Sequence, residues 1–335
     1  MLCGGIALVS YGSVPEDGPA EGQADFIEIT PQLRQAVGKG FVYLASVQGD
    51  AGSYGQDRYG RHVGITALAT MAFMADGHLP GRGKYGEQVE RGLGFILSSA
   101  QETGLIAADT SHGPMYGHGF ATLFLGEVYG MTGDPRVREV LVKAVRLIVA
   151  AQNHEGGWRY HPMQLDADIS VTICQIMALR SARNAGISVP HRTIERSISY
   201  VRRCQNSSDG GFRYMLGGGS SLFPRSAAGV ASLYHAGVYQ DDALNKGLQY
   251  LLKQKSIKSA RGTGHYYYGH YYAVQAMYLA GGHYWVEWFP WIRHQLLADQ
   301  DPKGQWKSNH GDHYGTAMAL LILQIPNRLL PIYQK

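Results

Sequence analysis

The chain has 335 residues, of which 45% are hydrophobic and 17% charged, and its net charge of +4 is not gathered in a basic run. This balance disfavours nucleic acid as a partner and is typical of a protein with a large core. No stretch of about 18 apolar residues occurs, so no transmembrane helix is predicted and membrane contact is expected to be at most peripheral. The cysteines, Cys3, Cys174 and Cys204, fit neither a disulfide framework nor a CxxC metal site. The apolar helical surroundings of the last two predict buried thiols.

Residues 1–28 are predicted to form an extended lead-in to a single helical domain over residues 29–330. After an apolar start, this segment is polar and rich in Gly and Pro. The start lacks the basic residues of a signal peptide but could be the end of a trimmed leader. A cytoplasmic and an exported location both remain open, as does the oligomeric state.

One short phrase recurs along the chain: a Gln, three intervening residues, and then Gly-x-aromatic. Its clearest copy is Gln152–Trp158. Copies of varying strength start at Gln residues 48, 101, 152, 205, 254 and 300, so successive copies are 46 to 53 residues apart. Six repeats of about 50 residues predict one stacked architecture, because a single repeat cannot bury its own apolar face.

Each repeat predicts an amphipathic helix before the turn and a more apolar helix after it. Residues 135–151 carry apolar side chains at helical spacing on one side, and Asp134 and Pro135 suit the start of a helix. Val63–Met74 is apolar nearly all round, as expected of a buried helix. The first helices are expected near 30–47, 86–100, 135–151, 191–204, 241–253 and 285–299. The second helices are expected near 62–75, 118–130, 168–183, 225–236, 270–280 and 313–324.

Twelve helices in alternating roles predict an all-α (α/α)6 toroid, with six parallel inner helices around a central cavity and six outer helices around them. An open superhelix is the alternative. The phrase at Gln152–Trp158 and Gln300–Trp306 resembles the QW motif of squalene-hopene and related triterpene cyclases. The six-pair organisation is similar to the toroid that these cyclases share with protein prenyltransferase β subunits. The resemblance implies that the Gln ties a helix end and that the aromatic residue packs on the neighbouring repeat.

A set of polar residues stands at the starts of the predicted inner helices. Aligning these helices on Thr66, Thr122, Thr172 and their counterparts places six polar residues four positions earlier. They are His62, His118, Asp168, Arg225, His270 and His313. In a closed toroid they would face one mouth of the cavity. Capping of helix N-termini is the alternative role, and the last two positions could shift by one, to Gly269 and Asp312.

The segment Asp166-Ala167-Asp168-Ile169 resembles the DxDD acid motif of class II terpene cyclases, although Ile169 replaces the last Asp. The resemblance implies that Asp168 protonates an alkene or epoxide, with Asp166 as its motif partner and His62 and His118 positioning it. Such an acid needs a raised pKa in an apolar cavity, whereas a helix N-terminus lowers a carboxyl pKa.

A carbocation formed by that acid would need aromatic ring faces around it. The residues expected to bind substrate are Trp158, Tyr160, Tyr214, Tyr267, Tyr271, His270, His313 and Arg225. The wider set of aromatic candidates also includes Tyr54, Tyr59, Tyr116, Phe212, Tyr266, Tyr268 and Tyr272. Arg225 suits an anion such as diphosphate, and alternatively a salt bridge to Asp168.

The ligand is expected to be a small apolar or isoprenoid molecule, and no cofactor is predicted. The prenyltransferase pair Asp-x-Cys, which binds zinc, is missing; a metal held by ring members such as His62, His118, Asp168 and His270 remains open. The sequence thus favours an isoprenoid-handling protein with acid-initiated cyclisation. The alternatives are a non-catalytic binding or scaffold toroid and a carbohydrate-active (α/α)6 enzyme, which would need two facing carboxylates.

Overall fold

The computed structural model describes residues 28–108, 113–255 and 265–334, and within these ranges it contains twelve α-helices and no β-strand. The outer helices are α1 (Pro31–Val47), α3 (Gly86–Ser98), α5 (Pro135–Ala151), α7 (His191–Cys204), α9 (Asp242–Gln254) and α11 (Gly282–Asp299). The inner helices are α2 (Val63–Met74), α4 (Met115–Thr132), α6 (Ile169–Asn184), α8 (Phe223–His235), α10 (Tyr266–Ala280) and α12 (Asp312–Leu323). The described ranges also contain three short 3-10 helices, which are η1 (Asp57–Tyr59), η3 (Ile325–Asn327) and η4 (Pro331–Tyr333).

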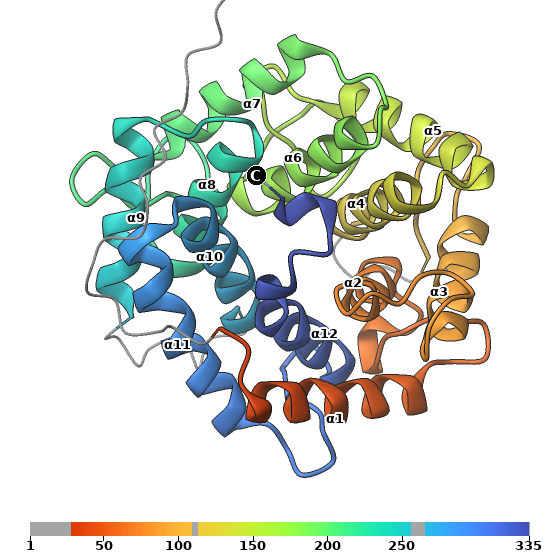
Figure 1. The fold of residues 1–335 in the computed structure, drawn as a ribbon. Coiled ribbons are helices and arrows are strands. Elements are labelled where there is room, and N and C mark those ends of the chain that lie inside the picture. The colour runs from red at the N-terminus through yellow and green to blue at the C-terminus, as the bar shows by residue number, and fades with distance from the viewer. Residues whose placement is uncertain (1–27, 109–112, 256–264, 335) are drawn as a thin grey trace, which may run out of the picture.

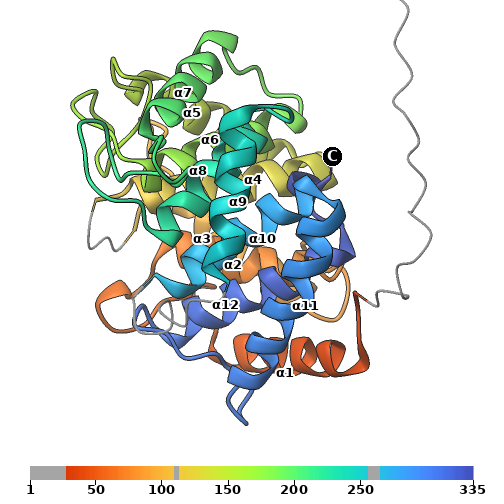
Figure 2. The same ribbon diagram turned by 90° about the vertical axis from the view of Figure 1, so that its left-hand side faces the viewer.

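The inner helices form a closed ring, which Figure 1 shows almost along its axis. Each packs on the next in chain order, and α12 packs back on α2. The outer helices cover the inner ones, as the side view of α9 and α11 in front of α8 and α10 shows (Figure 2). The protein is therefore an (α/α)6 toroid, and the open superhelix is excluded.

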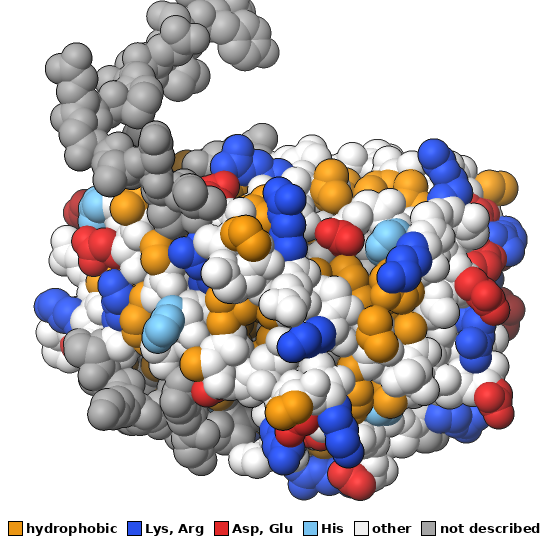
Figure 3. Space-filling model, turned by 60° about the horizontal axis from the view of Figure 1, so that its bottom comes forward, with side chains coloured by type: hydrophobic (Ala, Val, Ile, Leu, Met, Phe, Trp, Pro, Cys, Tyr) orange, Lys and Arg blue, Asp and Glu red, His pale blue; other side chains and the backbone are white. Residues whose placement is uncertain are grey.

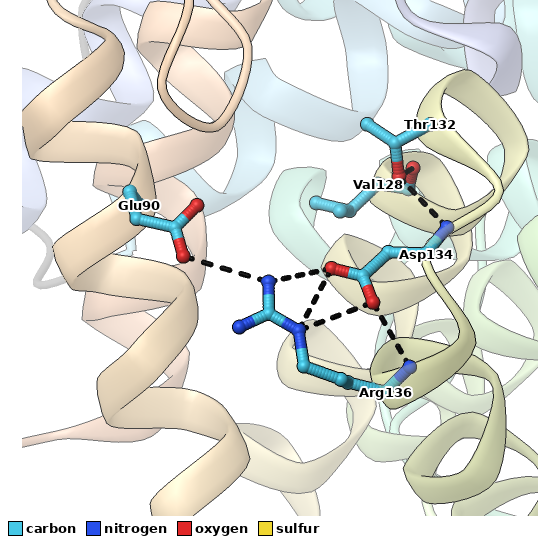
Figure 4. A network of polar contacts seen from close by, with 5 residues as sticks. All are labelled: Glu90, Val128, Thr132, Asp134 and Arg136. Atoms are coloured by element: carbon cyan, nitrogen blue, oxygen red, sulfur yellow. Dashed lines mark hydrogen bonds and ion pairs between the residues drawn. The ribbon is translucent and has the colours of Figure 1, made fainter.

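The two sets of helices differ in burial as their sequences predict. All twelve residues of α2 are buried, whereas α5 buries one stripe that includes Val137, Leu141 and Ile148. Asp134 caps α5 by accepting the N–H of Arg136. The Arg136 side chain pairs with Asp134 and reaches Glu90 on α3, so this exposed network links two neighbouring outer helices (Figure 4). Its exposure limits the stability that it adds.

The Gln-to-Gly turns are joints between successive repeats. Gln152 Nε2 donates to the carbonyl oxygen of Gly156 in its own turn and to that of Thr193 in α7, both at 2.9 Å. Gln300 does the same with Gly304 and with Ala36 of α1, at 2.9 and 2.8 Å. The last turn therefore fastens the sixth repeat to the first. The turn after Gln254 lies outside the described residues.

The glycine and the aromatic residue of these turns have separate packing roles. Gly156 has a φ of +102°, and a Cβ there would collide with the carbonyl oxygen of Arg196 in the next outer helix. Trp158 is 1% exposed, and its Nε1 donates to the Ile148 carbonyl oxygen at 2.7 Å. The expectation that Trp158 binds substrate is therefore wrong, because its ring is buried within its own repeat.

Residues 324–334, which we name the C-terminal strap, cross the ring at the carboxyl ends of the inner helices (Figure 1). Ile325, Leu330, Ile332 and Tyr333 of the strap are all buried. Gln324 and Asn327 donate from their side chains to carbonyl oxygens at the end of α2, at 3.0 and 2.9 Å. The strap thus covers one mouth of the toroid.

The surface carries no concentration of one charge on the face shown in Figure 3, where acidic and basic side chains are interspersed among apolar ones. Cys174 and Cys204 are buried free thiols, as expected. Within the described ranges, none of the helices has the length and apolar character needed to cross a membrane.

Candidate functional site

The mouth opposite the strap holds a cavity of about 310 Å³. This volume lies near the lower end of the range for small-molecule pockets, about 300 to 1,000 Å³. The first turns of α2, α4, α10 and α12 surround it together with η1. Ile65, Leu68 and Phe120 give it an apolar part.

Tyrosines and histidines make up most of the remaining lining. The tyrosines are Tyr59, Tyr116, Tyr160, Tyr268 and Tyr314, and the basic or imidazole side chains are Arg58, His62, His265 and His310. Among the residues that the structure describes, no Asp or Glu lines the cavity. The described part of the lining therefore offers ring faces and hydrogen-bond donors to a ligand.

The η1 side of the cavity is held by a set of ring contacts. Tyr59 Oη lies 2.7 Å from His310 Nδ1, and the Tyr59 ring meets the His62 ring edge-on at 5.9 Å. The Arg58 guanidinium lies 5.0 Å from the centre of the Tyr59 ring and donates to Tyr59 Oη at 3.2 Å. These contacts fix the position of the Tyr59 ring at the rim.

Asp168 is fully buried beside the cavity rather than in its lining. It caps α6, and its Oδ1 accepts the N–H groups of Ser170 and Val171 at 2.8 and 2.9 Å. Burial raises the pKa of Asp168 to about 6, although these N–H groups and the nearby Arg159 oppose the rise. A carboxyl with this pKa is partly protonated near neutral pH.

The second oxygen of Asp168 faces two side chains that connect it to the cavity. Arg159 Nε lies 3.6 Å from Oδ2. Oδ2 has no hydrogen-bond partner among the described residues, and burial raises the pKa of Asp168 while the nearby Tyr214 hydroxyl is the weakest of the groups that lower it. Tyr214 Oη forms a very short hydrogen bond with Tyr160 Oη, and Tyr160 lines the cavity. The Tyr214–Tyr160 pair thus connects the neighbourhood of the buried carboxyl to the cavity, without a hydrogen bond between Tyr214 and Asp168.

The predicted ring of six equivalent polar residues is wrong. Four inner helices place a hydroxyl where it accepts the N–H of the aromatic residue in the preceding turn: Thr66 from Tyr54, Thr172 from Trp158, Ser226 from Phe212 and Thr316 from Trp306. His118 Nδ1 accepts the N–H of Ile106 in the same way, at 3.1 Å. His118 is therefore the counterpart of Thr66 and not of His62. The residues that directly precede the inner helices are His62, Pro114, Asp168, Leu222, His265 and Gly311.

His62 and His118 consequently occupy different environments. His62 caps α2 and lines the cavity. His118 is fully buried one turn deeper and lies toward the backbone of Ala144 in α5, and burial lowers its pKa to about 4. The expectation that His118 positions Asp168 at the mouth is wrong, because its ring faces the outer layer.

The remaining expected residues are scattered. His270 is buried among Phe223, Tyr266, Trp288 and Trp291, where burial lowers its pKa to about 3. His313 Nδ1 accepts the Gly55 N–H at 3.2 Å, and Tyr267 and Tyr271 are 8% and 1% exposed. None of these residues is in the cavity lining.

Arg159, rather than Arg225, is the cation beside the Asp residues. It lies 3.0 Å from Asp166, whose side chain is 56% exposed, and also reaches Asp168. Arg225 lies 5.8 Å from the centre of the Tyr214 ring and outside the lining. The alternative of an Asp168–Arg225 salt bridge is therefore wrong, because Arg159 takes that place.

A metal site built from the proposed ring members is not formed. Across the described ranges, no group of three or more His, Cys, Asp or Glu side chains is arranged to hold a metal ion. The four candidate ligands lie in different parts of the fold. His62 lines the cavity and Asp168 caps α6 beside it, whereas His118 faces α5 and His270 packs against aromatic side chains of α11.

Several lining residues escaped the sequence analysis, namely Arg58, His265, His310 and Tyr314. Tyr59, Tyr116 and Tyr268 were among the wider aromatic candidates. Their position in the sequence could have identified these residues. Each lies either in the segment between a Gly-rich turn and an inner helix or in the first turn of that helix.

No family model matches the chain, and the comparison with curated proteins gives no significant match. Solved structures give clear matches in fold. The type II terpene cyclase MstE from Scytonema is 14% identical with a TM-score of 0.63, covering 90% of this chain and 100% of that chain. A variant of MstE in complex with geranylgeranyl dihydroxybenzoate, its substrate, is 13% identical with a TM-score of 0.63, covering 89% and 98%. The GH76A α-1,6-mannanase from Salegentibacter sp. HEL1_6 is 10% identical with a TM-score of 0.66, covering 89% and 99%. At these identities the similarity establishes the shared toroid alone.

Proposed function

We propose that this toroid binds a small isoprenoid in its tyrosine-lined cavity and starts an acid-initiated cyclisation of it. The observation that carries the proposal is the hydrogen-bonded pair of hydroxyl groups, Tyr214 and Tyr160, which joins the surroundings of the buried Asp168 carboxyl to the cavity. The structure of an MstE variant in complex with geranylgeranyl dihydroxybenzoate, its substrate, shares the fold and supports the choice of ligand class.

The geometry favours a relayed proton over direct contact between Asp168 and the substrate. Tyr160 donates its hydroxyl proton to an alkene or epoxide, Tyr214 reprotonates Tyr160, and Asp168 reprotonates Tyr214. The carboxylate left behind is stabilised by the N–H groups of α6 and by Arg159, both already in place. The pKa of about 6 keeps part of the protein in the protonated state that the first step needs.

The cavity supports the later carbocation because aromatic faces stabilise positive charge. Tyr116 and Tyr160 pack with their ring centres 6.0 Å apart, and burial, followed by the nearby Asp168 carboxyl, raises the pKa of Tyr116. The ring wall and the proposed proton source therefore lie on the same side of the cavity.

The decisive experiment compares wild type, Asp168→Asn and Tyr160→Phe with farnesol, farnesoic acid and geranylgeraniol and with their terminal epoxides. Asn is also a good helix cap, so Asp168→Asn should fold. We expect cyclic products from wild type and a loss of about 100-fold or more in both variants, as general acids contribute about 10²- to 10⁴-fold. Asp50→Asn, which alters an exposed carboxyl outside the cavity lining, is the control and should keep wild-type turnover. Equal turnover by wild type and Asp168→Asn would exclude Asp168 from the mechanism.

A non-catalytic binding toroid is the second candidate, and one observation favours it. Asp168 makes the contacts of a structural cap, with two helical N–H groups and Arg159 as partners. Tight binding of a substrate that is recovered unchanged would support this candidate. A glycosidase receives less support, because such enzymes use two carboxylates that flank the bond and the described lining of this cavity contributes none.

A further inference from the structure

The cavity is chemically asymmetric. Its apolar part, Ile65, Leu68 and Phe120, comes from the inner helices α2 and α4. Arg58, Tyr59 and His310 lie on the η1 side, at or just before the starts of inner helices. A ligand that fills both parts must have one apolar end and one polar end.

Arg58 is the arginine of the described cavity lining. An arginine carries a positive charge, and its guanidinium fork suits a planar acceptor. Its described contacts are with Tyr59, at the ring face and the hydroxyl. Among the described residues, neither Asp57, its neighbour in the sequence, nor Asp312, at the start of α12, forms an ion pair with Arg58. The charge of Arg58 is thus not neutralised by a carboxylate of the described chain.

His62 lines the same part of the cavity and has a defined tautomer. Its Nδ1 accepts the N–H groups of Gly64 and Ile65 at 3.1 and 3.3 Å. The proton of the neutral imidazole must therefore lie on Nε2. The positive ends of the α2, α4, α10 and α12 dipoles also point to this mouth, so the potential there favours an anion.

We propose that the ligand is an isoprenoid or similar apolar acid whose carboxylate is bound by Arg58 at the η1 side. This inference deepens the proposed function and rests on the same cavity. The apolar chain lies along Ile65, Leu68 and Phe120, and the carboxylate accepts from the guanidinium and from the donors around Tyr59.

One arginine matches a monocarboxylate better than a diphosphate. The guanidinium fork pairs with the two oxygens of a carboxylate and carries one compensating charge. A diphosphate carries two or three charges and commonly needs several cations or a divalent metal ion. The described lining provides one arginine and no lysine, and no metal-binding group is formed elsewhere in the described ranges.

The test measures dissociation constants of farnesoic acid, farnesol and farnesyl diphosphate by calorimetry, for wild type, Arg58→Gln and Arg82→Gln. Arg82 is an exposed arginine between α2 and α3 that does not line the cavity, so it controls for loss of a surface charge. Wild type and Arg82→Gln should bind the acid about tenfold or more tightly than the alcohol, as expected for a charged hydrogen bond. In Arg58→Gln this ratio should fall to near one, with affinity for the alcohol unchanged.

Each other outcome is informative. Equal binding of acid and alcohol by wild type overturns the inference and leaves the proposed function standing. An acid preference that survives Arg58→Gln removes Arg58 as the anion-binding residue. Tighter binding of the diphosphate than of the acid overturns the assignment to a carboxylate. Binding of none of the three probes refutes the proposed function itself, and this inference with it.

Discussion

Replacing Glu127 by Gln should stabilise the protein at alkaline pH. Glu127 is fully buried near the end of α4, where its Oε2 accepts the N–H of Ile332 in the C-terminal strap at 3.0 Å. Its Oε1 lies 2.6 Å from Ser181 Oγ, and Ser181 Oγ also lies 3.1 Å from the Leu123 carbonyl oxygen. Ser181 has one hydroxyl proton for two acceptors. A protonated Glu127 resolves the conflict by donating to Ser181, which then donates to Leu123.

The size of the effect follows from the pKa of this carboxyl. Burial raises the pKa of Glu127 from 4.5 to about 7, although the Ser181 and Ile332 hydrogen bonds oppose the rise. A raised pKa means that the folded state binds more protons than the unfolded state between these values, so stability falls as pH rises through this window. A shift of about 2.5 units at about 1.36 kcal/mol each makes the loss about 3 kcal/mol once pH exceeds 7.

Gln reproduces the protonated form: its amide donates to Ser181 and its oxygen accepts from Ile332. The free energy of unfolding of Glu127→Gln minus that of wild type should therefore grow by about 3 kcal/mol between pH 4.5 and 8. Urea unfolding at four pH values, followed by circular dichroism, measures this difference. Glu102→Gln, at a side chain that is 97% exposed, should follow wild type at every pH. Parallel pH curves for Glu127→Gln and wild type would refute the reasoning.

Two further substitutions test the scaffold. Gly156→Ala should lower the free energy of unfolding by about 3 kcal/mol or more, because it combines a left-handed φ with a collision against α7. The control Gly94→Ala, on the exposed side of α3, should raise the free energy of unfolding by about 0.5 kcal/mol. Thermal melting compares the two variants, and equal melting temperatures would contradict the role of the turn as a joint between repeats. Ile332→Ala should cost about 2 to 5 kcal/mol in urea unfolding because the side chain is 3% exposed, and a change no larger than that of exposed Val42→Ala would show that the strap does not close the core.

The fold could be predicted from the sequence because its organising signal is repeated and local. The Gln-to-Gly spacing located each helix pair, and burial periodicity separated the one-sided outer helices from the inner ones. Even the helix limits were close, as for residues 135–151, which α5 occupies as Pro135–Ala151. The strap escaped prediction because it belongs to no repeat, and its burial depends on contacts with residues as distant as Glu127.

The site could be predicted only in part, because one residue type can fill two structural positions. His62 and His118 both stand near the start of an apolar helix, and alignment on a nearby Thr made them appear equivalent. In the structure, Nδ1 of the two histidines accepts hydrogen bonds from different segments. His62 Nδ1 caps its own helix, whereas His118 Nδ1 takes the place of a Thr hydroxyl and accepts an N–H of the preceding turn. The sequence cannot distinguish a histidine that substitutes for Thr66 from one that faces a cavity, since the acceptor roles are chemically the same.

The acid role of Asp168 also depends on contacts that the sequence motif does not show. Its motif suggested an acid in contact with substrate, and two of its contacts, the α6 N–H groups and Arg159, favour the ionised form. Burial opposes both and is the largest influence on its pKa, so the acid property depends on the side chains that keep water away. Tyr160 and Tyr214 lie between the carboxyl and the cavity and also provide the hydroxyl groups of the relay. We thus assign two roles to Tyr160 and Tyr214, the exclusion of water and the transfer of the proton. Tyr160→Phe separates these roles, because it keeps the ring and removes only the hydroxyl.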